Sequence, residues 1–138
     1  MKVKDLMKEW VKVKPDTKVS ELAKILDKHL TGSALVVDGN VPVGVVTERD
    51  ILRKIVTNGK SPREIEVRRI MSSPVITIDA SEDLTTASDL MDSKRIRRLA
   101  VVDNGKVIGK ITTNVISKNF RYLWGRHIAD YAHYEEHR

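Results

Sequence analysis

The sequence predicts a mixed α/β fold built from two copies of one small strand and helix unit. An internal repeat is the first observation: residues 3–7 (VKDLM) return as residues 67–71 (VRRIM), and residues 34–38 (ALVVD) return as residues 99–103 (LAVVD). Self-similarity of this kind indicates a duplicated supersecondary unit. In addition, short β-branched runs alternate with segments whose apolar residues recur at helical spacing. Each copy is therefore expected to fold as strand, helix, strand, strand and helix.

The first copy carries a clear hairpin signal. Asp38-Gly39 and Gly39-Asn40 are turn dipeptides of the kind that join antiparallel strands, and apolar runs flank them on both sides. A turn and helix start at Asp16-Thr17 separates the first strand from the first helix. Strands are expected at Val11 to Val13, Ala34 to Val37 and Val43 to Val46, with helices from Val19 to Leu26 and from Thr47 to about Asn58.

The second copy repeats this order, with Asn104-Gly105 as its hairpin turn. Its strands are expected at Val75 to Ile78, Leu99 to Val102 and Val107 to Ile111, with one helix from Leu84 to Met91 and another after the last strand. A polar stretch with Gly and Pro at residues 58–63 separates the copies. The expected organisation is a first copy at 1–58, a linker at 59–66, a second copy at 67–118 and a C-terminal helical extension at 119–138.

Size and composition limit the possible functions. A domain of about 60 residues would bury only about 60% of its unfolded surface, so the two halves of this 138-residue chain are expected to share an interface, and that interface is a natural cleft. The sequence contains no cysteine, no membrane-spanning apolar run and no signal-peptide pattern, which predicts a cytoplasmic protein. The net charge of +6 favours anionic partners without distinguishing nucleotide, nucleic acid and acidic protein.

Three motifs stand in register with the repeat: residues 44–50 (GVVTERD), 70–77 (IMSSPVIT) and 97–103 (RRLAVVD). Through them the sequence resembles a pair of CBS motifs, called a Bateman module, over about residues 1–118. The resemblance implies two βαββα repeats that pack pseudo-symmetrically through their small sheets. It also implies a non-catalytic regulatory module that binds AMP, ADP, ATP or S-adenosylmethionine in the cleft between the motifs, forms a homodimer and acts on an effector protein in trans.

Asp50 and Thr47 are the first candidates for ligand binding. Asp50 follows Thr47 by three residues at a helix start, where its carboxylate can accept hydrogen bonds from vicinal ribose hydroxyls. The hydroxyl of Thr47 and the helix N-terminus beside it are suited to a phosphate. The same Thr-x-x-Asp pattern also predicts a capping box, in which both side chains satisfy the helix itself. Thr47 can serve both roles, whereas Asp50 cannot easily do so.

The resemblance places the adenine slot at Pro74, Val75 and Ile76, with Ile96 on its other side. Each of these apolar residues would also suit the core of such a fold. The prediction of an adenine slot therefore depends on their combination with Asp50. Arginines that could bind phosphate complete this main site: Arg49, Arg97 and Arg98. The alternative is that these charged residues only form a solvent-exposed surface.

A second, weaker site is expected at the equivalent positions of the other copy. Thr112 matches Thr47, but Val115 stands where the first copy has Asp50 and cannot accept a hydrogen bond from ribose. Asn114 offers a partial substitute or a helix cap. The other walls of this site would be Trp10, Val11 and Lys12 with Thr31, Gly32 and Ser33, where Trp10 could stack on a base or pack in the core.

The C-terminal segment concentrates aromatic residues and predicts packing or dimerisation. His127, His133 and His137 do not share one helical face, so no metal site is expected. No nucleophile has a catalytic partner in the sequence, and neither enzymatic activity nor a catalytic cofactor is expected. The two alternative functions are nucleic-acid binding, suggested by the cluster from Lys94 to Arg98, and a purely structural dimerisation module.

Overall fold

The computed structural model describes residues 1–119, which form two compact units with one three-stranded sheet each. The first unit comprises residues 9–76, and the second combines residues 1–8 with the chain from Thr77 onward. The predicted α/β architecture with two related repeats is confirmed. The predicted C-terminal extension and its three histidines lie, apart from residue 119, outside the described residues.

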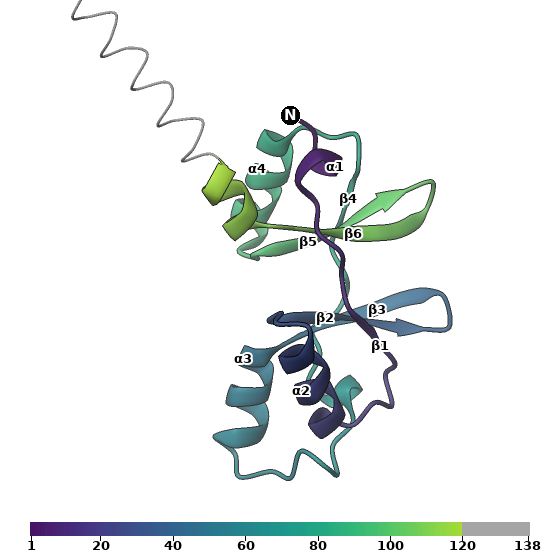
Figure 1. Ribbon diagram of the computed structural model, residues 1–138, viewed down its shortest axis with the longest axis vertical. Coiled ribbons are helices and arrows are strands. Elements are labelled where there is room, and N and C mark those ends of the chain that lie inside the picture. Colours follow the sequence, from purple (N-terminus) through teal and green to yellow (C-terminus); the bar gives the residue numbers. More distant parts are fainter. Residues whose placement is uncertain (120–138) are drawn as a thin grey trace, which may run out of the picture. The chain divides into compact units, whose positions relative to one another are not determined.

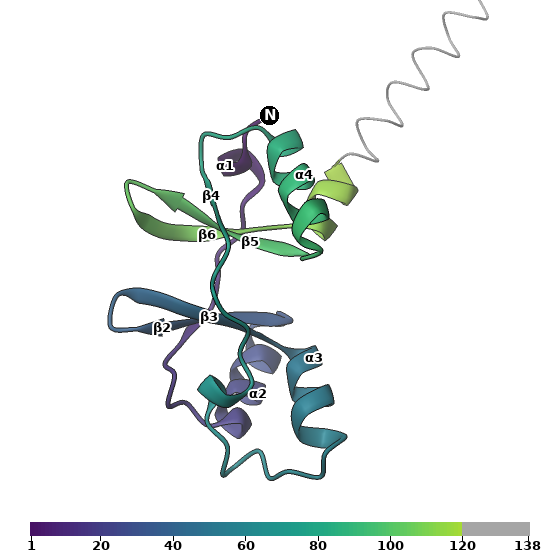
Figure 2. The same cartoon turned by 180° about the vertical axis from the view of Figure 1, so that it is seen from behind.

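The sheet of the first unit has the strand order β1-β2-β3. Strand β2 pairs in parallel with β1 on one side and antiparallel with β3 on the other. Figures 1 and 2 show the helices of this unit on one side of its sheet. The elements are β1 (Lys12–Val13), α2 (Val19–Lys28), β2 (Ser33–Asp38), β3 (Val41–Thr47), α3 (Glu48–Ile51), its π-helical continuation η1 (Leu52–Val56) and the 3₁₀ turn η2 (Val67–Arg69).

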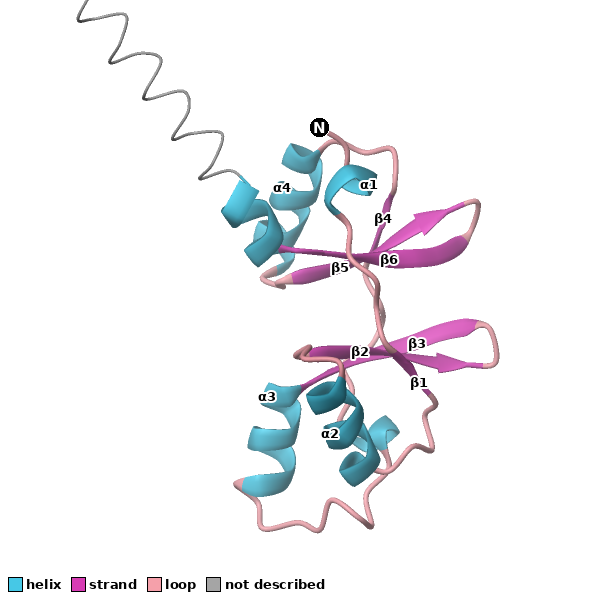
Figure 3. Ribbon diagram, viewed as in Figure 1, coloured by secondary structure: helices cyan, strands magenta, loops and turns pink. Residues whose placement is uncertain are grey.

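The second unit repeats this arrangement with the strand order β4-β5-β6, again with one parallel and one antiparallel pair. Figure 3 shows its helices and its sheet as separate layers. Its elements are α1 (Val3–Leu6), β4 (Thr77–Asp79), α4 (Leu84–Lys94), β5 (Arg98–Asp103) and β6 (Lys106–Thr112), followed by a helix at residues 113–119.

The core of the first unit lies between α2 and its sheet. Val19, Leu22 and Leu26 are buried at helical spacing on one face of α2. They belong to one apolar cluster with Val36 and Val46, which point to the same side of the sheet. The apolar periodicity read from the sequence therefore identifies the face that the helix buries.

The two hairpin turns differ in their backbone geometry. In the first turn Gly39 has φ +62°, while Asn40 is not among the residues with positive φ, as expected for a type II′ turn. In the second turn both Asn104 (φ 51°) and Gly105 (φ 76°) are left-handed, as in a type I′ turn. The order Gly-Asn in one copy and Asn-Gly in the other thus selects a different turn for the same connection.

The short segments that open the two repeats are exchanged between the units. The buried residue Val67 opens the second repeat, yet its amide donates to Thr17 O of the first repeat at 2.8 Å. Val3, also buried, opens the first repeat, and its amide donates to Glu82 O of the second at 2.9 Å. The boundaries of the packed units therefore differ from those of the duplicated sequence.

The strand predicted from Val75 begins two residues later, at Thr77. Residue 76 is the last residue of the first unit, and the chain enters the second unit at Thr77, where pairing with β5 starts opposite Ala100. Val75 and Ile76 therefore contribute apolar, half-buried side chains to the first unit without joining the ladder of the second.

Candidate functional site

Thr47 and Asp50 form a complete capping box at the start of α3. The Thr47 amide donates to Asp50 Oδ2 at 2.9 Å, and the Asp50 amide donates to Thr47 Oγ1 at 3.1 Å. The Thr47 hydroxyl also lies 3.1 Å from Asp50 Oδ2. The capping alternative seen in the sequence is thus confirmed, and it fixes both side chains at the end of β3.

The other oxygen of the Asp50 carboxylate faces a lysine. Lys54 Nζ lies 3.2 Å from Asp50 Oδ1, one helical turn further on, and also donates to Ile70 O at 2.8 Å. The Asp50 side chain is 15% exposed, whereas that of Lys54 is 45% exposed. Because a carboxylate offers about four lone-pair positions, the capping box and Lys54 leave Oδ1 able to accept one further hydrogen bond.

The segment that contains Pro74, Val75 and Ile76 follows a short extension of the same sheet. Ser72 exchanges two backbone hydrogen bonds with Val45 of β3, at 2.8 and 2.9 Å. The chain runs antiparallel to β3 there, so the predicted adenine-slot residues proceed away from the end of the strand that carries Thr47. Arg49 is exposed on α3. The candidates Ile96, Arg97 and Arg98 belong to the second unit, and their part in the same site stays a prediction.

Trp10 packs inside the first unit. Its side chain is 5% exposed, and its indole N–H donates to Ser33 Oγ at 3.1 Å. Beside it, Gly32 O accepts a hydrogen bond from the Glu48 amide at 2.9 Å. Of the two alternatives for Trp10, packing is therefore confirmed, and Ser33 is buried as its partner.

Two basic side chains and one hydroxyl share a face of the second sheet. Arg98 of β5 stands opposite Thr112 of β6, and Ala100 stands opposite Lys110. Because side chains alternate along a strand, Arg98, Lys110 and Thr112 point to the same side, with the small Ala100 two residues from Arg98 and opposite Lys110. This arrangement brings a cationic pair and a hydroxyl together on one sheet, which is suited to a phosphate group.

Lys110 is a candidate that the sequence analysis missed. Partial burial, with a smaller contribution from the positive charge of Arg98, lowers its pKa below the ordinary value of 10.5. The signal was available in the repeat, because Lys110 occupies the position that Val45 holds in the first copy. A lysine in the middle of an apolar strand indicates a possible functional residue, because its ammonium loses hydration there at a cost in stability.

Replacing Lys110 by methionine is expected to raise the free energy of unfolding at pH 7 and low salt by up to about 1 kcal/mol, after allowance for solvent screening. The folded-state pKa lies below the unfolded one, so the wild type gains stability as pH rises between the two values, and the difference between the proteins shrinks. Urea unfolding at pH 7 and pH 10 measures this. Lys106→Met, at an exposed position of the same strand, is the control, and equal effects of both changes at pH 7 would contradict the explanation.

The helix start after β6 lacks the acidic half of the capping box. The Val115 amide donates to Thr112 Oγ1 at 3.2 Å, as the Asp50 amide does to Thr47 in the first unit. Asn114 is exposed, and Arg97 O accepts the Thr113 amide at 2.9 Å. The two units thus share their backbone geometry at this point, but only the first presents a carboxylate.

Within residues 1–119, no helix is long and apolar enough to cross a membrane. The same residues contain no group of three or more His, Cys, Asp or Glu side chains that could hold a metal ion.

The chain matches the family model of the CBS domain twice, over residues 3–57 and 67–120. It is 41% identical to an uncharacterized protein of Methanopyrus kandleri over 111 residues, which are 79% of this chain and 57% of the relative. It is 30% identical to the CBS domain-containing protein YhcV of Bacillus subtilis, over 85% of this chain and 84% of that protein. This chain thus spans little more than half of the archaeal relative and most of the bacterial one.

Solved structures share the fold at similar levels of identity. An uncharacterized conserved protein of Pyrococcus horikoshii superposes with a TM-score of 0.78 and 28% identity, covering 87% of this chain and 92% of that one. The CBS domain pair of protein MJ0100, in complex with 5′-methylthioadenosine and S-adenosyl-L-methionine, superposes with a TM-score of 0.75 and 30% identity, covering 87% and 95%.

Proposed function

Because the chain belongs to the CBS domain family, we propose that it is a non-catalytic regulatory module that binds an adenosyl ligand: AMP, ADP, ATP or S-adenosylmethionine. The observation that carries the proposal is the position of Asp50, a mostly buried carboxylate held at a helix start by Thr47. The complex of the related pair of protein MJ0100 with two adenosyl compounds supports the ligand class.

In this proposal Asp50 binds the ribose. Its Oδ2 is occupied by the Thr47 amide and hydroxyl, so the ligand hydroxyls donate to Oδ1. Lys54 is the competitor for Oδ1, but its side chain is nearly half exposed, so its ammonium can be hydrated when it leaves Asp50. Ribose hydroxyls can therefore displace Lys54 while the capping box stays intact.

Within the second unit, taken by itself, the cationic sheet face is proposed to bind a phosphate group. A phosphate offers several acceptor oxygens, and the neighbouring positive charges of Arg98 and Lys110 each favour an anion beside them. Thr112 adds a hydroxyl donor on the same face. S-adenosylmethionine carries a single carboxylate in place of phosphate, so this face is expected to matter more for AMP, ADP and ATP. The adenine slot at Pro74, Val75, Ile76 and Ile96, and the assistance of Arg49 and Arg97, remain predictions.

Regulation then follows from differential affinity: a ligand that binds one arrangement of the protein more tightly than another shifts the population toward it. The homodimer and the effector protein on which the shift acts stay predictions, as does the cytoplasmic location. Nucleic-acid binding and a purely structural role remain the alternatives to be tested against this one.

Calorimetric titration of AMP, ATP and S-adenosylmethionine into wild type and Asp50→Asn tests the ribose assignment. The asparagine oxygen can still accept the Thr47 amide, so the cap is kept while the charge is lost. Loss of charge-assisted hydrogen bonds, about 1.5–3 kcal/mol, is expected to weaken all three ligands roughly 10- to 150-fold. Asp38→Asn, at an exposed position of the hairpin, is the control.

Unchanged affinity in Asp50→Asn for all three ligands would refute the assignment of Asp50. A complementary titration with Lys110→Met separates the ligands, since AMP and ATP are expected to lose more affinity than S-adenosylmethionine. Absence of any adenosyl binding by the wild type would refute the proposed function itself.

A further inference from the structure

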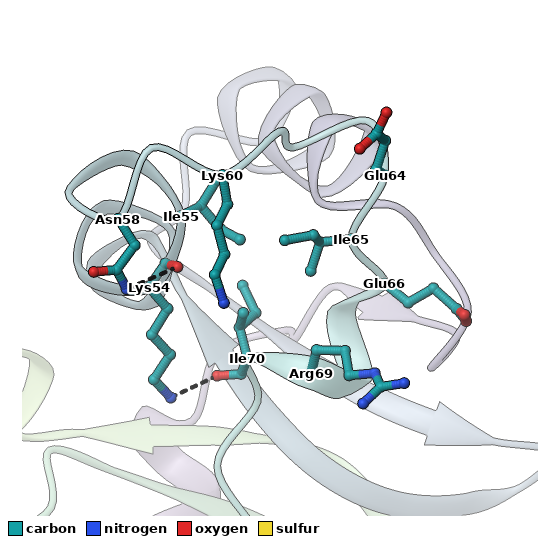
Figure 4. Close-up of a pocket in the computed structure, with 9 residues that line it drawn as sticks. All are labelled: Lys54, Ile55, Asn58, Lys60, Glu64, Ile65, Glu66, Arg69 and Ile70. Atoms are coloured by element: carbon teal, nitrogen blue, oxygen red, sulfur yellow. Dashed lines mark hydrogen bonds between the residues drawn. The ribbon is translucent and has the colours of Figure 1, made fainter.

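A pocket of about 500 Å³ lies in the first unit, between the end of helix η1, the linker and η2. Figure 4 shows three isoleucines around it, Ile55, Ile65 and Ile70. Ile55 and Ile70 are almost fully buried and belong to the core cluster, so they fix the base of the pocket, and the half-buried Ile65 is the isoleucine that presents apolar surface to it. The volume lies within the range of about 300–1,000 Å³ that is typical of small-molecule sites.

Three cations also line this linker pocket: Lys54, Lys60 and Arg69. Within the described residues, neither the Lys60 ammonium nor the Arg69 guanidinium forms a hydrogen bond or an ion pair. Lys54 Nζ holds Ile70 O at 2.8 Å and Asp50 Oδ1 at 3.2 Å, which leaves one of its three N–H donors.

The acidic residues of the pocket do not neutralise these cations. The Glu66 carboxylate is paired with Arg68, at 3.1 and 3.2 Å, and Arg68 does not line the pocket. Glu64 is exposed, and Figure 4 shows its carboxylate directed away from the isoleucines. The pocket therefore combines one accessible apolar side chain, Ile65, with an excess of positive charge.

The geometry of the chain at the end of η1 explains why the Lys60 side chain reaches the pocket. Gly59 has φ +64°, its amide donates to Val56 O at 3.2 Å, and the Lys60 amide donates to Ile55 O at 3.0 Å. These two bonds define a Schellman motif, in which the residue after the left-handed glycine usually packs an apolar side chain back onto the last turn. Lys60 occupies that position, and Figure 4 shows its side chain extending from the linker into the pocket. Its aliphatic stem can lie on apolar surface while its ammonium stays available to a ligand.

We propose that the linker pocket binds a small organic phosphate, whose apolar body contacts Ile65 and whose phosphate is held by Lys60 with Arg69 and Lys54. The site differs from the one proposed for the adenosyl ligand, because neither Thr47 nor Asp50 lines it, although Lys54 contributes to both through its ion pair with Asp50. A phosphate monoester is the class that matches several cationic donors beside an apolar surface.

Butyl phosphate, inorganic phosphate and butanol are the probes, titrated into the full chain while amide and methyl shifts of Ile55, Ile65 and Ile70 are followed by NMR. Butyl phosphate is expected to bind most tightly, inorganic phosphate more weakly, and butanol without measurable shifts. Lys60→Gln is expected to weaken butyl phosphate at least about tenfold, as loss of one charged hydrogen bond predicts. Lys28→Gln, an exposed lysine at the far end of α2, is the control and is expected to bind like wild type.

Equal weakening by Lys28→Gln would show a nonspecific charge effect and overturn the proposal, as would unchanged binding in Lys60→Gln. Asp50→Asn is expected to keep butyl phosphate binding, even though it loses the adenosyl ligand. A failure of the linker pocket and a failure of the proposed adenosyl site can therefore be distinguished in the same set of proteins.

Discussion

Leu22→Ala is expected to lower the free energy of unfolding of the first unit by about 2–5 kcal/mol, the range for leucine truncation in a packed core. Leu22 is fully buried in the middle of α2, between Val19 and Leu26. The lost methyl groups leave a cavity beside Val36 and Val46 that neighbouring strands cannot fill without moving. Urea unfolding followed by circular dichroism measures the loss, and hydrogen exchange assigns it to residues 9–76.

Leu30→Ala provides the matched control, because it is the same substitution in the same unit at a side chain that is 92% exposed. A change within about 0.5 kcal/mol is expected there. If both variants lost similar stability, α2 would not pack on the sheet as described.

Gly109→Ala is expected to destabilise the second unit by about 1–3 kcal/mol, the usual cost of overpacking. A Cβ at Gly109 would lie 2.6 Å from Lys8 O, which is a backbone atom. Lys8 exchanges two hydrogen bonds of 2.9 Å with Lys110 at this crossing, so the segment cannot withdraw without breaking them. Urea unfolding reports the loss, and faster exchange of the Lys8 and Lys110 amides locates it.

The repeat supplies the control for this variant. At the equivalent Gly44, a Cβ would lie 2.5 Å from Met71 Sδ and 3.0 Å from Ser72 O. Its closest neighbour is a flexible thioether side chain, which can change rotamer at modest cost. Gly44→Ala is therefore expected to lose less stability than Gly109→Ala, and the reverse order would contradict the argument from backbone contact.

Local patterns were sufficient to predict most elements of the fold. Turn dipeptides at Gly39 and Gly105 between β-branched runs identified both hairpins, and the spacing of Val19, Leu22 and Leu26 identified the buried face of α2. The start of β4 was misplaced because Val75 and Ile76 are as apolar as strand residues, and a short apolar run does not show at which residue strand pairing begins.

The candidate sites show a similar division. Thr47 and Asp50 were found because a capping box and a ligand-binding motif have the same spacing, and the structure confirms the cap. Lys110 lies outside the three motifs of the repeat, and only the pairing of β5 with β6 brings it close to Arg98. The linker pocket forms because the chain returns from η1 to η2. This is a tertiary contact, and the polar residues of the linker give no local sign of it.

The exchange of the opening segments has a consequence for cleavage of the chain. A single cut in the linker at residues 59–66 would divide the sequence between the repeats, but it would not separate the two units. The N-terminal fragment would retain residues 1–8 of the second unit, and the C-terminal fragment would retain residues 67–76 of the first. Each unit would then be assembled from both fragments, joined through the buried Val3 on one side and Val67 on the other. A protease could thus nick the linker and leave a noncovalent complex that still holds both folds.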